Sequence, residues 1–119
     1  MQGPGPYRDL FKAIDTADVE GFMKWLADDC SFTYGSQDPV RGAEAVRAMV
    51  DGFLQSFAAV GHQVDANWEV DGTAITEGTV TYTTDDGRST AIPFCNVFHL
   101  AEDGRIRDYR IYIDPAPLG

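Results

Sequence analysis

The stretch from Ile92 to Asp114 reads IPFCNVFHLAEDGRIRDYRIYID and predicts two antiparallel strands joined by the acidic turn AEDG. Apolar and polar residues alternate on both sides of this turn, and its glycine can supply the positive φ that a tight hairpin needs. Two further turn signals precede it, VDG at 70–72 and TDDG at 84–87. Together with the alternating segment HQVDANWEV at 62–70, they predict four successive antiparallel strands.

Three amphipathic helices are expected before these strands. Residues 7–32 place apolar side chains at three- and four-residue spacings in two runs, with Asp18 as the N-cap of the second helix. The segment CSFTYG at 30–35 is typical of a short strand, SQDPVRG at 36–42 of a loop, and AEAVRAMVDGFLQSF at 43–57 of a third helix. This order indicates an α+β domain in which helices cover one face of a curved, mainly antiparallel sheet.

Length and charge narrow the classes of function. The chain of 119 residues is expected to form one domain over 1–119, with residues 1–6 flexible. Its formal net charge of -10 argues against nucleic acid and anionic membrane surfaces as partners, and no apolar run approaches the roughly 20 residues of a membrane helix. We therefore expect a cytoplasmic protein, in which Cys30 and Cys95 are unpaired. The lack of phosphate-loop, GxSxG, HExxH and paired-histidine motifs predicts neither cofactor nor metal.

Three segments resemble the nuclear transport factor 2-like superfamily and, within it, the SnoaL-like polyketide cyclase branch. They are DTADVEGFMKWLADDCSFTYG at 15–35, VRGAEAVRAMV at 40–50 and EDGRIRDYRIYIDP at 102–115. The resemblance covers nearly the whole chain and implies a conical fold that encloses an apolar pocket and often dimerises through its outer sheet face. The superfamily includes ketosteroid isomerase, limonene epoxide hydrolase and polyketide cyclases beside non-catalytic binding modules, so the fold does not decide the function.

The resemblance also indicates where such relatives carry catalytic groups. The isomerase's general-base Asp falls at Tyr34, its oxyanion-hole Tyr at Leu10, and its protonated Asp at Asn96, whose amide can donate a hydrogen bond without any pKa shift. The final-strand Asp of the epoxide hydrolase and cyclase branches falls at Ile111. The usual catalytic Asp positions are therefore Tyr34 and Ile111, and whether the protein is an enzyme stays open.

The strand period selects the candidate site residues. Asn96 lies between Phe94 and Phe98 and is expected to face inward, either in a structural hydrogen bond or as a donor to a ligand carbonyl. His62 is the best general base, with a place at the rim as the alternative, whereas His99 is expected on the outer face. The predicted catalytic set is Asn96, Tyr34 and His62, and the predicted ligand-binding set is Trp25, Phe53, Trp68, Phe94 and Tyr109.

Three functions follow from these residues. In the first, the pocket binds an apolar, oxygenated ring compound and isomerises or cyclises it, with Asn96 and Tyr34 polarising a carbonyl and His62 moving a proton. The second is a non-catalytic ligand-binding or dimerisation module. The third is an epoxide hydrolase with relocated acids, for which Glu77 is a second-choice base and Asp114, more simply structural, the other acid. A homodimer is expected through the outer face of the last strand, which carries Tyr112 among charged residues.

Overall fold

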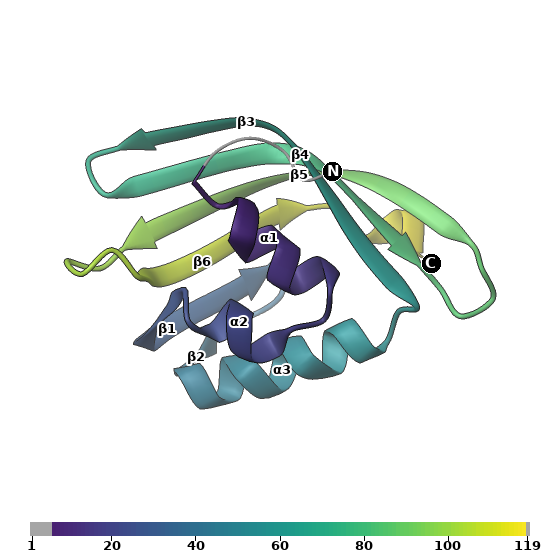
Figure 1. The fold of residues 1–119 in the computed structure, drawn as a ribbon, viewed down its shortest axis with the longest axis horizontal. Helices are drawn as coiled ribbons and strands as arrows, with labels where there is room; N and C mark the ends of the chain where they lie inside the picture. The colour runs from purple at the N-terminus through teal and green to yellow at the C-terminus, as the bar shows by residue number, and fades with distance from the viewer. Residues whose placement is uncertain (1–5, 119) are drawn as a thin grey trace.

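The computed structural model describes residues 6–118 and shows helices on one face of a curved, six-stranded sheet (Figure 1). The helices are α1 (Arg8–Asp15), α2 (Val19–Met23) and α3 (Ala43–Gln55), and a short 3-10 turn, η1, covers Ala116–Leu118. The strands are β1 (Leu26–Tyr34), β2 (Val40–Arg41), β3 (Ala59–Val70), β4 (Thr73–Thr83), β5 (Ser89–Leu100) and β6 (Ile106–Ile113). The predicted α+β class is confirmed. Of the segment 1–6, only Pro6 belongs to the described residues.

The strands are ordered β2-β1-β6-β5-β4-β3, so the first long strand lies beside the last one. The β1–β6 pair is parallel, and every other neighbouring pair is antiparallel. The four-strand meander β3 to β6 is as predicted. Three boundaries differ from the sequence prediction. Leu26 begins β1 because it pairs with Ile106, the two-residue β2 lies in an expected loop, and β3 begins at Ala59, which pairs with the end of β4.

A bulge in β3 changes which side chains face the helices. Val64 pairs with Gly78 and Ala66 with Glu77, so the intervening Asp65 has no partner on β4. An extra residue reverses the inward and outward alternation beyond it. Trp68 consequently faces away from the helices and is 51% exposed. The expectation that Trp68 lines the pocket is therefore wrong.

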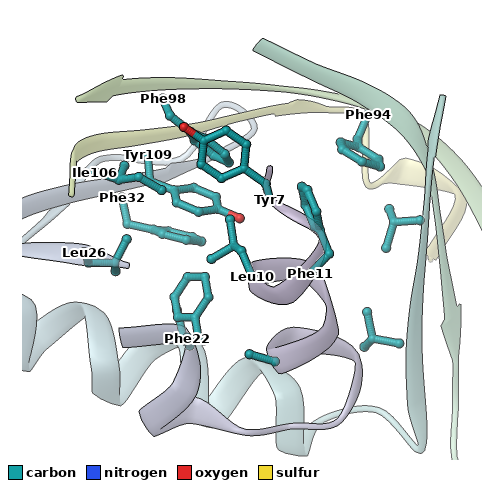
Figure 2. Packing of buried hydrophobic residues seen from close by; sticks show 14 of the residues in the cluster. Tyr7, Leu10, Phe11, Phe22, Leu26, Phe32, Phe94, Phe98, Ile106 and Tyr109 are labelled. Atoms are coloured by element: carbon teal, nitrogen blue, oxygen red, sulfur yellow. The ribbon is translucent and has the colours of Figure 1, made fainter. Parts of the chain in front are cut away.

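Aromatic rings fill one end of the space between helices and sheet. Figure 2 shows Tyr7, Leu10 and Phe11 at the start of α1 pointing toward the rings of Phe98 and Tyr109. The Tyr7 and Phe98 centroids lie 5.2 Å apart, and those of Phe98 and Tyr109 lie 4.4 Å apart. Trp25 joins this end of the core, 5.7 Å from the ring of Tyr7. This close packing leaves the other end for a cavity.

Candidate functional site

The cavity has a volume of about 90 Å³ and lies between α3, the end of α1 and the concave face of the sheet. Its wall is mostly apolar, with Met49, Val50, Phe53 and Leu54 contributed by α3. The polar lining residues are Tyr34, Gln37, His62, Tyr82, Asn96 and Tyr109. Among the described residues, the lining contains no lysine, arginine, aspartate or glutamate. Because a buried ion needs an opposite charge, this wall favours a neutral ligand.

His62 on β3 is held by the carboxylate of Asp15, the last residue of α1. Asp15 Oδ1 lies 2.6 Å from His62 Nδ1, and Asp15 Oδ2 accepts the His62 backbone N–H at 3.0 Å. The two side chains are only 13% and 11% exposed, and the imidazole packs against the rings of Phe11 and Phe94. A carboxylate at Nδ1 favours the tautomer that carries its proton there, which leaves Nε2 with a lone pair. The pair therefore has the arrangement of an oriented general base on the cavity wall.

Asp15 was missed by the sequence prediction. It stands at the break between two predicted helices, where an aspartate usually has a local role, and 47 residues separate it from His62. No spacing in the sequence joins the two positions. Only the packing of α1 against β3 brings them together.

Asn96 on β5 lies deep in the wall and is 2% exposed. It stands in register with Thr76 on β4 and with Ile111 on β6, the position where the resemblance places a catalytic Asp. Within residues 6–118, the Asn96 Oδ1 atom has no hydrogen-bond partner. An unsatisfied buried amide oxygen costs about 1–3 kcal/mol, so this atom is suited to receive a hydrogen bond from a ligand.

Tyr34 and Tyr82 meet across the cavity. Their hydroxyl oxygens lie 3.1 Å apart, although β6 and β5 separate their strands in the sheet, so the contact depends on the sheet's curvature. Burial raises the pKa of Tyr34, and the hydrogen bond with Tyr82 opposes that rise. Burial also raises the pKa of Tyr82, and the bond with Tyr34 adds to the rise. Both phenols are therefore neutral hydrogen-bonding groups. Tyr82 was not among the predicted site residues, although it shares the alternation of its strand.

The remaining predicted site residues divide between the cavity and other parts of the fold. Tyr109, Phe53 and Phe94 line the cavity, and burial, followed by the charge of Asp15, raises the pKa of Tyr109. Trp25 and Trp68 do not line it. For Trp25 the reason is its position against Tyr7 at the filled end, and for Trp68 it is the bulge.

The two acids considered for an epoxide hydrolase lie outside the cavity. Glu77 is exposed on the outer face of β4. The Asp114 side chain follows β6, is exposed, and accepts a hydrogen bond from the backbone N–H of Ala116. Neither carboxylate can therefore act on a molecule in the cavity, and the hypothesis that relocates the acids to these residues is wrong.

Metal, thiol and membrane features were also sought in residues 6–118. No group of three or more His, Cys, Asp or Glu side chains suited to a metal ion occurs there. Cys30 is a buried free thiol and Cys95 a partly buried one. No helix in this part of the chain is both long and apolar enough to cross a membrane.

A family model described as SnoaL-like domain matches residues 7–109. Similar solved structures include an NTF2-like protein of unknown function from Burkholderia pseudomallei K96243, with a TM-score of 0.84, 22% identity, and 93% of this chain and 89% of that chain covered. They also include an LEH-like epoxide hydrolase from M. tuberculosis, with a TM-score of 0.77, 19% identity, and coverage of 91% and 79%. TerC, co-crystallised with polyporic acid, has a TM-score of 0.81, 12% identity, and coverage of 92% and 88–89% of the two chains, printed as 92% and 89%. A search of curated proteins gave no match.

Proposed function

Because the chain belongs to the SnoaL-like domain family, we propose that its cavity binds a small, neutral, oxygenated ring compound and catalyses a proton transfer on it, as an isomerase or a cyclase does. The observation that carries this proposal is the Asp15–His62 pair on the wall of an otherwise apolar cavity. TerC, a protein of similar fold, was co-crystallised with polyporic acid, which supports the use of this fold to hold a small organic molecule.

The proposed reaction begins at a carbon atom next to a carbonyl group. His62 Nε2 removes a proton from this carbon, and Asp15 keeps the imidazole in the required tautomer and balances the imidazolium charge. The electron pair moves toward the carbonyl oxygen, where neutral donors of the wall stabilise the developing negative charge. Return of the proton to another carbon completes an isomerisation, whereas attack of the carbanion on a second carbonyl completes a cyclisation.

The volume restricts the ligand. The cavity measures about 90 Å³. A cavity of about 150 Å³ encloses one benzene ring. A six-membered ring is therefore accommodated only if it extends past the exposed Gln37 at the edge of the cavity or if a side chain such as Phe53 moves. The ligand should be small, or only one end of a larger molecule should enter.

The first experiment is a thermal-shift titration against neutral steroid, terpenoid and aromatic polyketide ketones, because a ligand of the folded state raises the melting temperature. Exchange of the α-protons of each stabilising ketone with deuterium oxide is then followed by NMR. We expect His62→Gln to slow the exchange by about 100-fold, in line with the loss of a general base. His99→Gln is the matched control, because His99 lies on the other face of the sheet and bonds to Thr73. Equal exchange in His62→Gln and the unchanged protein would contradict the assignment of the base.

The second candidate function is a non-catalytic ligand-binding module. It is favoured by Tyr34 and Ile111, which stand where the resemblance places catalytic acids, and by the fully apolar character of Ile111 in the wall. A ketone that raises the melting temperature without any exchange above the rate in buffer would support this function instead.

A further inference from the structure

Two polar groups on the cavity wall have hydrogen-bonding capacity that the protein leaves unused, and they differ in kind. Asn96 Oδ1 is an acceptor without a donor in the described part of the chain. The Tyr34–Tyr82 pair contains two hydroxyl protons, of which their mutual hydrogen bond uses one. No other hydrogen bond from either hydroxyl occurs among residues 6–118. The wall therefore offers one unused acceptor and one unused donor.

The acceptor at Asn96 calls for a ligand O–H or N–H group. Its side chain lies in the wall at 2% exposure, so bulk water does not replace the missing bond. The donor at the tyrosine pair calls for an oxygen with a lone pair. Burial raises the pKa of both phenols, so the unused proton stays on the pair and can be donated.

The charges of the wall exclude a simpler way to satisfy both groups. A carboxylic acid also carries a donor and an acceptor, but it ionises near neutral pH unless its surroundings prevent it. The lining has no lysine or arginine to balance a carboxylate, and Asp15 lies directly behind His62. A neutral compound with a hydroxyl and a separate carbonyl satisfies the wall without an uncompensated charge.

We propose that the ligand of this cavity is a hydroxy-ketone whose hydroxyl donates to Asn96 Oδ1 and whose carbonyl accepts from the Tyr34–Tyr82 pair. The inference rests on the proposed function, because it takes the cavity to be a ligand site, and it adds the class and orientation of the ligand. It assigns carbonyl polarisation to the tyrosine pair and recognition of the hydroxyl to Asn96. Tyr82, which the sequence did not single out, becomes a ligand-contacting residue.

The test compares three probes of similar shape: 4-hydroxycyclohexanone, 4-methylcyclohexanone and cyclohexanone. Binding is measured from changes in the backbone amide NMR signals, up to the solubility of each probe. We expect the hydroxy-ketone to bind about tenfold more tightly than the methyl compound, since one buried neutral hydrogen bond has about this effect. Equal binding, or tighter binding of the methyl compound, would overturn the proposal, as would the failure of all three to bind. This comparison requires no variant.

Two variants then separate the two contacts. Asn96→Leu should remove or reverse the preference for the hydroxyl, whereas Tyr82→Phe should weaken both substituted ketones by about the same factor. A preference for the hydroxyl that survives Asn96→Leu, in a variant with a native amide spectrum, contradicts the proposed orientation.

His62→Gln distinguishes this inference from the proposed function. It should abolish proton exchange and keep the preference for the hydroxyl, because binding and proton transfer use different residues. Loss of exchange together with an unchanged preference would support both proposals, and a preference without exchange in the unchanged protein would leave only the ligand class.

Discussion

Thr76 has a hydroxyl that is fully buried on β4 and that has no hydrogen-bond partner among residues 6–118. Valine has the same shape without the unsatisfied oxygen, so we expect Thr76→Val to raise the free energy of unfolding by about 1 kcal/mol. Urea denaturation measures this change. Thr83→Val is the control, because the Thr83 hydroxyl lies 2.8 Å from Ser89 Oγ and its loss should not stabilise the protein. A less stable Thr76→Val would reveal a partner of the hydroxyl, such as a water molecule shared with Asn96.

Tyr82 and Tyr109 make stability depend on alkaline pH. Burial is the main cause of their raised pKa values in the folded protein, whereas an unfolded tyrosine loses its proton near pH 10. Their contribution is therefore complete below about pH 10 and is lost as the pH rises toward the folded values. Each tyrosine should lower the free energy of unfolding by up to about 1.4 kcal/mol per pH unit in that range. In urea denaturation above about pH 10, Tyr109→Phe should reduce this slope, and an unchanged slope would contradict the prediction.

At the scale of elements, the bulge in β3 brings its backbone against Gly78 of β4. A Cβ atom at position 78 would lie 1.9 Å from the carbonyl oxygen of Gln63, so a side chain requires the strands to separate. We expect Gly78→Ala to lower the free energy of unfolding by about 3 kcal/mol, the upper part of the usual cost of overpacking. Gly61→Ala on β3 is the matched control, because its Cβ would meet nothing within 4 Å. Similar stability of the two variants would show that the bulge adapts without strain.

The same bulge marks the limit of prediction from sequence. Strand period places His62 and Val64 correctly on the inner face, because both precede Asp65. It fails for Trp68, because a bulge depends on the partner strand and leaves no mark in the alternation. The helices and the meander were predictable since their signals are local. The Asp15–His62 contact was not, since it depends on the packing of α1 against β3.

For the whole molecule, the outer face of the sheet holds the largest exposed apolar side chains. Trp68, Tyr112 and Val70 are 51%, 54% and 64% exposed, respectively. Trp68 stands in register with Ile75 on β4, which in turn pairs with Val97 on β5. A continuous apolar surface of this kind marks an interaction site. Arg110 and Glu77 lie on the same face, so a two-fold arrangement can bring opposite charges of two copies together.

We therefore expect a homodimer through this outer face. Sedimentation equilibrium should give twice the chain mass of 13.0 kDa. Trp68→Glu should shift the equilibrium to the monomer, because it places a charge in the apolar centre of the interface, where an unpaired ion is costly. Ala58→Glu adds the same charge at an exposed position outside the sheet and should leave the dimer intact. A mass of 13.0 kDa at every concentration, or equal dissociation of both variants, would contradict a dimer at this face.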